Sequence, residues 1–133
     1  MGGSPEGRRA TPDGGGVTLE LAILAPVLVL LVFTVVQLAL WSFARSLALG
    51  AAQEGLAAAR VESGTVQAGR TTAHDFLTRT GPDSLLAPAV VVRVTPSAVE
   101  VEVSGRAQSV LPGVSGLPVL QRARGPVERF TRP

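Results

Sequence analysis

The sequence predicts an α+β membrane protein: a long N-terminal helix, a second short helix and a small antiparallel β-hairpin or sheet of two to three strands. The first observation behind this prediction is a run of twenty-four residues, 21–44, without a charge. The second is helix-favouring sequence beyond that run, which gives the helix a transmembrane half and an extracellular half. The third is a pair of segments in which valine alternates with other residues, as in a half-buried strand.

Composition narrows the classes of function. The chain has 133 residues, enough for one small folded region beside a membrane span. Its arginines are scattered and it has only four Phe and one Trp, so we expect no nucleic-acid partner. Cysteine is absent and His74 is the only histidine, which argues against thiolate chemistry, a metal centre or histidine-based catalysis. We therefore expect no enzyme, no cofactor, no metal and no small-molecule substrate.

Residues 1–15 are expected to form a disordered cytoplasmic leader. They are rich in glycine, proline and charge and offer no apolar residue that could anchor a core. Arg8 and Arg9 lie before the span, and the positive-inside rule then places the N terminus in the cytoplasm. Arg45 and Arg60, on the other side of the span, reduce this charge bias. We expect a single-pass protein of the cell membrane with its C-terminal head outside the cytoplasm.

Residues 16–45 are predicted to form the transmembrane helix. The uncharged residues 21–44 would run for about 36 Å as a helix. A hydrocarbon core is roughly 30 Å thick, so this run can cross it with some tilt. Pro26 removes one backbone hydrogen bond inside the helix and is expected to kink it.

Four side chains near the far end of the span differ from the apolar background. Gln37 is the only strongly polar group deep in the run. Its side chain either hydrogen-bonds to a neighbouring helix or lies in the membrane without a specific partner, at a modest cost in free energy. Trp41 and Phe43, next to Arg45, are typical of the membrane–water interface.

Residues 46–62 are expected to continue the helix outside the membrane, with only Gly50 and Gly55 weakening its helical propensity. Small residues recur along one side of this half, which would let another helix approach closely. Alanine is common in this chain and favours helices in any case, so the stripe also has a purely local explanation. The stripe consists of Ala44, Ala48, Ala51, Gly55 and Ala59.

Residues 63–127 are expected to form a small α/β head. A helix is predicted over residues 65–80, because Ser63-Gly64 precedes this segment and Gly81-Pro82-Asp83 follows it. His74 is expected on its surface, and Asp75 would point in another direction, so the two do not form a catalytic pair. The apolar face of this helix is predicted to consist of Val66, Ala73, Phe76 and Leu77.

Two strands, residues 89–95 and 98–104, are predicted to form a hairpin with a turn at Pro96-Ser97. This turn places Val94 opposite Val99, and Arg93 opposite Glu100 on the other face. In this register six valines lie on one side of the hairpin. Because an isolated hairpin is only marginally stable, we expect a helix to cover that side. The six are Val90, Val92, Val94, Val99, Val101 and Val103.

Residues 110–118 hold two prolines and two glycines and are expected to form a loop. Residues 119–127 can supply a third strand, with Arg122 and Arg124 on one face. The tail, residues 128–133, is expected to fray.

The entry to the span carries the motif that indicates a function. Residues 15–20 read GGVTLE, which puts Glu20 five residues after Gly15 at the start of the apolar helix. This arrangement resembles the processing site of type IV pilin-like proteins. The string GVTLELAILAPVLVLL, with AAQEGLAAAR and the terminal GPVERF, is similar to the TadE-like family of Tad (Flp-type) pilus systems.

The resemblance implies a pseudopilin or minor pilin that prepilin peptidase cuts between Gly15 and Gly16. Its implied partners are the membrane, the peptidase, other pilin-like subunits and the Tad assembly platform, and it could reach a surface pilus. Glu20 would pair with the new α-amino group of a neighbouring subunit and set the register between helices, with Pro26 and Gln37 as further register positions. Otherwise Glu20 marks the membrane–water boundary and favours the helix N-terminal dipole.

Two other functions remain open at this point. One is an uncleaved single-span protein whose head binds another component of the cell envelope. The other is an exported soluble protein, since Ala48-Leu49-Gly50 offers small residues to a signal peptidase and the product would then start near Ala51.

Overall fold

The computed structural model describes residues 2–3, 13–61 and 64–127. The elements follow one another as two helices and then three strands. The chain divides into two compact units, Met1–Thr34 and Val35–Pro133. Most of the predicted leader, Ser63 of the predicted helix break and the tail 128–133 lie outside the described residues. The predicted fold class, α+β with one helix that could span a membrane, is confirmed.

Helix α1, Asp13–Arg60, is one continuous helix of 48 residues. It includes both the segment predicted as the transmembrane half and the segment predicted as the extracellular half. It begins three residues inside the predicted leader and ends two residues before the predicted end at 62. Pro26 lies inside it without ending it, and the predicted kink stays a prediction. Between Gly16 and Arg60 the helix contains a long, strongly apolar stretch, none of which is buried. By length and composition, α1 can cross a membrane.

Helix α2, Val66–Thr80, begins one residue after the predicted start at 65 and ends at the predicted residue. The hydroxyl oxygen of Thr65 accepts a hydrogen bond from the backbone N–H of Ala68 at 3.0 Å, which caps the N-terminus. The apolar face was predicted with one error, because Val66 is exposed and Gly69 is buried in the face instead. Val66 is the first residue of the helix, whereas Gly69, Ala73 and Leu77 recur every fourth residue along one side.

The three strands form one antiparallel sheet in the order β1-β2-β3, namely Leu85–Val94, Ala98–Ala107 and Pro118–Pro126. The predicted hairpin register is confirmed: Val94 pairs with Val99, and Arg93 pairs with Glu100. The turn is closed by Thr95, whose N–H donates to the carbonyl of Ala98 at 2.8 Å. The third strand also forms, one residue earlier than predicted at each end.

Strands β1 and β2 are longer than predicted. β1 begins at Leu85 and passes through an irregularity between Leu86 and Ala89, where Ala87 has φ +49° and Pro88 follows. This β-bulge accommodates Pro88, which has no backbone N–H to donate, and pairing with β2 resumes at Ala89. Val94 lies on the predicted side, opposite Val99, but it is 51% exposed rather than covered. It is the last residue of an edge strand, whereas its partner Val99 is on the central strand and fully buried.

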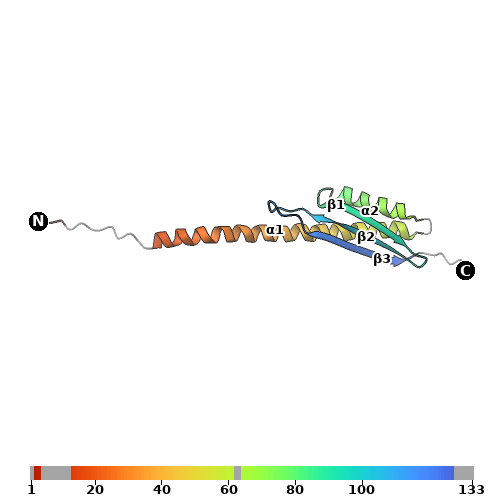
Figure 1. Ribbon diagram of the computed structural model, residues 1–133, viewed down its shortest axis with the longest axis horizontal. Coiled ribbons are helices and arrows are strands. Elements are labelled where there is room, and N and C mark those ends of the chain that lie inside the picture. Colours follow the sequence, from red (N-terminus) through yellow and green to blue (C-terminus); the bar gives the residue numbers. More distant parts are fainter. Residues whose placement is uncertain (1, 4–12, 62–63, 128–133) are drawn as a thin grey trace. The chain divides into compact units, whose positions relative to one another are not determined.

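The core lies between one face of the sheet and the two helices (Figure 1). A Cβ placed on Gly55 of α1 would lie 3.4 Å from a methyl group of Val101, and one on Gly69 of α2 would lie 3.5 Å from a methyl group of Val92. Because these two valines share the buried face, both helices cover the same side of the sheet. The α1 residues in this core are Ala44, Leu47, Ala48, Ala51, Ala52, Leu56 and Ala59.

The stripe of small residues on α1 is therefore occupied within the chain. Ala44, Ala48 and Ala51 are fully buried in this core. At Gly55 the neighbouring element is α2, since a Cβ on Gly55 would lie only 2.9 Å from the carbonyl oxygen of Gly69. At Gly55 and Ala59, the helix that approaches the stripe is α2 of the same chain.

Candidate membrane-entry and processing site

The predicted processing motif lies in the first part of α1. Gly15, Gly16 and Glu20 are all helical. Glu20 is exposed between Leu19 and Leu21, which are 64% and 57% exposed. Gly16 precedes Glu20 by four residues, so the two lie on the same side of the helix. A Cβ at Gly16 would meet no atom within 4 Å, which leaves the surroundings of that residue open.

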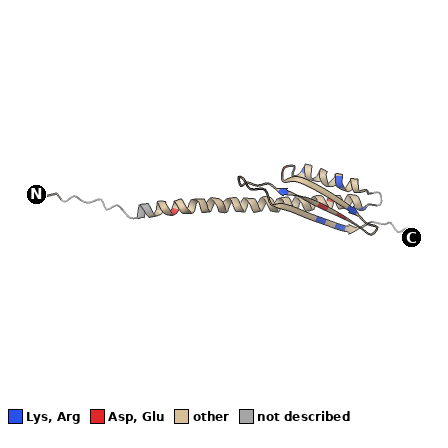
Figure 2. Cartoon of the chain, viewed as in Figure 1, with Lys and Arg blue, Asp and Glu red and all other residues tan. Residues whose placement is uncertain are grey.

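The part of α1 that follows Glu20, residues 21–44, has an apolar surface without charge. Figure 2 shows its long uncharged course, in contrast to the blue and red positions on α2 and the strands. Large side chains such as Ile23, Leu30 and Val35 are each about 60% exposed. Pro26 lies in the same exposed stretch. A charged Glu20 thus marks the boundary of a surface that suits lipid rather than water.

Gln37 lies where this apolar surface meets the head. Its side-chain Nε2 donates to the carbonyl oxygen of Gln108 at 2.9 Å, and its Oε1 accepts from the N–H of Val110 at 3.0 Å. The side chain therefore joins α1 to the loop between β2 and β3. This gives Gln37 an intramolecular role, and its contact with a neighbouring subunit stays a prediction.

Trp41, one turn after Gln37, makes a second contact with the end of the same loop. Its indole Nε1 donates to the carbonyl oxygen of Pro118 at 3.2 Å. The guanidinium carbon of Arg45 lies 4.8 Å from the centre of the Trp41 ring, a cation–π distance. Phe43 does not join them and is 49% exposed. The three residues predicted at the membrane interface thus lie on two sides of α1.

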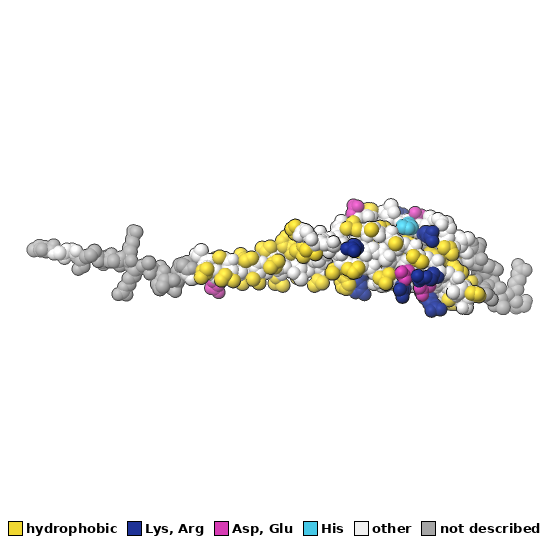
Figure 3. Space-filling model, in the orientation of Figure 1, with side chains coloured by type: hydrophobic (Ala, Val, Ile, Leu, Met, Phe, Trp, Pro, Cys, Tyr) yellow, Lys and Arg dark blue, Asp and Glu magenta, His cyan; other side chains and the backbone are white. Residues whose placement is uncertain are grey.

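The outer face of the sheet carries ion pairs. Arg93 lies 3.0 Å from Glu100 and 3.6 Å from Glu102, and Arg122 lies 2.7 Å from Glu102. Figure 3 shows acidic and basic side chains gathered close together on the head. Each pair is solvent-exposed and contributes about 0–1 kcal/mol.

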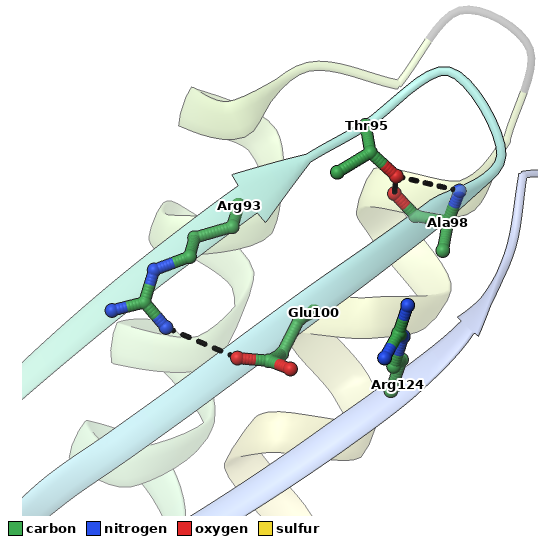
Figure 4. Close-up of a pocket in the computed structure, with 5 residues that line it drawn as sticks. All are labelled: Arg93, Thr95, Ala98, Glu100 and Arg124. Carbon is green, nitrogen blue, oxygen red and sulfur yellow. Dashed lines mark hydrogen bonds and ion pairs between the residues drawn. The ribbon is translucent and has the colours of Figure 1, made fainter.

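A shallow hollow of about 140 Å³ lies beside these pairs, between β3 and the turn that joins β1 and β2. In Figure 4 Arg93 points toward Glu100, and Arg124 reaches the hollow from the neighbouring strand. Among the residues that the structure describes, no three His, Asp or Glu side chains gather as a metal site. The hollow is open to solvent and lined by charged side chains, and it is not an enclosed cavity.

One packing position was missed by sequence reasoning. Gly55 was predicted as part of the small-residue stripe, but its partner Gly69 on α2 was treated as unremarkable, and the two approach each other closely. A signal was present, because glycine costs about 1 kcal/mol relative to alanine inside a helix. Its use in otherwise helix-favouring sequence indicates a tight packing position.

Comparison with known proteins identifies the segment that contains this site. Searches against curated proteins and solved structures gave no match. Residues 15–56 match the family model described as TadE-like protein. The match begins at Gly15, includes Glu20 and Gln37, and ends before α2 and the sheet. Residues 15–56 are therefore similar to TadE-like proteins, the family that the membrane-entry motif resembles.

Proposed function

We propose that this chain is a structural or assembly subunit, a pseudopilin or minor pilin, of a Tad-type pilus or a related secretion system. In this proposal prepilin peptidase cuts it between Gly15 and Gly16. The observation that carries the proposal is the position of the family match, which begins at Gly15, five residues before the exposed carboxylate that opens the apolar helix. A match to a structural family supports assembly rather than catalysis.

The local sequence suits proteolysis at this bond. Three consecutive glycines, Gly14, Gly15 and Gly16, lie in the first turns of α1. Each glycine costs about 1 kcal/mol relative to alanine in a helix, so this end of α1 can open at low cost. A protease requires such local opening of its substrate. The apolar residues that follow would keep the rest of the helix in the membrane while the leader is removed.

Cleavage would give Glu20 a partner of opposite charge. The new α-amino group at Gly16 is mostly protonated at neutral pH. A carboxylate at the edge of hydrocarbon is costly unless it is paired. When α1 helices of several subunits lie side by side, pairing of Glu20 with the amine of a neighbour would fix their relative height. Pro26 and Gln37 lie further along the same helix as additional register positions.

The remainder of the chain supplies the surfaces of the subunit. Trp41, Phe43 and Arg45 would mark the outer boundary of the membrane, with the head outside the cytoplasm. In this proposal the head contacts other pilin-like subunits and the assembly platform, and its charged sheet face is available for such contacts.

The mature N terminus tests the proposal. The full chain is produced in cells with and without an active prepilin peptidase, and the membrane and sheared surface fractions are analysed by mass spectrometry. We expect a 118-residue form that begins at Gly16 only when the peptidase is active. A chain that keeps residues 1–15 in the presence of the peptidase would favour an uncleaved envelope protein. A soluble product that starts near Ala51 would favour a secretion signal.

A matched pair of variants isolates the role of the acidic residue. Glu20→Leu is expected to accumulate uncut or to fail to assemble, because it removes the carboxylate that lies five residues after Gly15. Glu54→Leu removes an exposed carboxylate from the same helix outside the predicted span and should be processed normally. Equal processing and assembly of both variants would contradict a special role for Glu20.

A further inference from the structure

The loop between β2 and β3 is held against α1 at the position where the apolar surface meets the head. The amide of Gln37 bonds to the backbone of Gln108 and Val110, and the indole of Trp41 bonds to Pro118. These contacts hold both ends of the loop within one turn of α1. Figure 1 shows the loop beside the helix at this point.

The composition of the loop differs from that of the rest of the head. Residues 107–121 contain no charged side chain, whereas both flanking residues, Arg106 and Arg122, are charged. Ala107 and Val119, at its two ends, are buried in the core, but two large apolar side chains between them are not: Val114 is 55% exposed and Leu117 is 42% exposed. Figure 3 shows hydrophobic side chains gathered where the loop meets α1. An apolar, uncharged surface beside a candidate membrane helix suits a lipid environment.

The length of the span places this loop at the level of the bilayer. A membrane helix needs about 20 predominantly apolar residues, and more when it is tilted. Only the sixteen residues 21–36 separate Glu20 from Gln37. The hydrocarbon region must therefore extend past Gln37 to about residue 40, where the loop is bonded to the helix. The paired amide of Gln37 is consistent with this depth, because unpaired polar groups are costly in hydrocarbon.

We propose that the β2–β3 loop inserts its apolar tip, Val114 and Leu117, into the outer leaflet of the phospholipid bilayer. The head is then seated on the membrane surface by a second, reversible contact beside the helix. This inference rests on the membrane anchoring in the proposed function but not on the cleavage. The loop then has a lipid-binding role. A subunit must release this contact with lipid when it leaves the bilayer for an assembly.

The absence of cysteine allows a direct test with single labels. Val114→Cys is labelled with a polarity-sensitive fluorophore, and the full chain is reconstituted in phosphatidylethanolamine–phosphatidylglycerol vesicles. Ser97→Cys, at the exposed hairpin turn, is the control expected in water, and Leu30→Cys is the control expected in hydrocarbon. We expect lipid-attached quenchers to quench the label at 114 at least threefold more than the label at 97. A label at 114 that is quenched no more than the one at 97 would overturn the inference.

Two comparisons separate this inference from its alternatives. If the label at 30 is quenched by lipid and the label at 114 is not, membrane anchoring stands and only the loop insertion fails. If neither is quenched, the anchoring itself fails and the inference fails with it. Dilution of labelled chains tenfold into lipid should leave the quenching at 114 unchanged. If the quenching at 114 changes on dilution, a second copy of the chain covers the loop. That result also overturns the inference.

Discussion

Gly55 of α1 and Gly69 of α2 approach each other so closely that neither position has room for a side chain. A Cβ on Gly55 would lie 2.9 Å from the carbonyl oxygen of Gly69, and a Cβ on Gly69 would lie 3.0 Å from the carbonyl oxygen of Gly55. The obstacle in both cases is backbone, which cannot rotate away as a side chain can. This crossing fixes how α2 packs on α1 and therefore how both helices cover the sheet.

Gly55→Ala is therefore expected to destabilise the head. Overpacking of this kind typically costs about 1–3 kcal/mol, and the gain in helix propensity of about 1 kcal/mol offsets only part of it. We expect a net loss of up to about 2 kcal/mol in the free energy of unfolding, measured by chemical denaturation of the full chain in detergent.

Gly50→Ala provides a matched comparison one and a half turns earlier. Its Cβ would meet the ring of Phe76, a half-buried side chain that can shift, at 2.8 Å. We expect a smaller loss than for Gly55→Ala. If Gly55→Ala is as stable as the original chain, the helices do not pack at this crossing.

The hairpin register predicts a contrast between two valines. Val101 is fully buried on the central strand, whereas Val94 is 51% exposed at the end of β1. Val101→Ala should cost about 2–3 kcal/mol, because removal of buried methyl groups leaves a cavity. Val94→Ala should cost within about 0.5 kcal/mol, as surface substitutions do. Thermal unfolding followed by circular dichroism measures both, and equal losses would be incompatible with this register.

The hairpin was predictable in detail because two independent requirements agree on one register. A shift by one residue would move the valines to solvent and separate Arg93 from Glu100. The extension of β1 back to Leu85 was not predictable, because Pro88 interrupts the alternating pattern and the bulge at Ala87 has no local sequence signal.

The candidate site was predictable only in its local part. Gly15, Gly16 and Glu20 are adjacent along the chain, so their arrangement follows from sequence spacing. Gln37 was recognisable as an unusual polar residue, but its partner Gln108 lies 71 residues away. Pairing over that distance depends on the packing of the whole head, which periodicity does not encode.

Gln37→Leu is expected to release the β2–β3 loop from α1. The substitution would leave the carbonyl of Gln108 and the N–H of Val110 without their partner, a loss of about 1–3 kcal/mol when such groups are buried. The effect should be local, with faster hydrogen exchange across residues 108–114 and little change in β1. Thr34→Val, which removes a hydroxyl that bonds only to Leu30 of its own helix, is the control. Unchanged exchange in the loop of Gln37→Leu would show that the amide does not hold it.

The ion pairs on the outer face of the sheet are expected to contribute little to stability. Glu102 contacts both Arg93 and Arg122, but the two arginine side chains are 57% and 58% exposed. Glu102→Gln should therefore cost no more than about 1 kcal/mol, and less in high salt. Denaturation at low and high ionic strength measures this difference. A loss above 2 kcal/mol that salt does not reduce would mean that these charges are shielded from solvent.

The charge on Glu20 should matter for assembly after cleavage. If the carboxylate pairs with the α-amino group of a neighbouring Gly16, Glu20→Gln keeps the size and hydrogen bonding of the side chain but loses the ion pair. We expect this variant to be recovered in assembled material at least tenfold less than the original chain, while Glu20→Asp recovers part of the loss. Mass spectrometry of the same samples shows how much of each variant has been cut. Assembly of a cut Glu20→Gln variant at the normal level would exclude the charge pair and leave Glu20 as a marker of the membrane boundary.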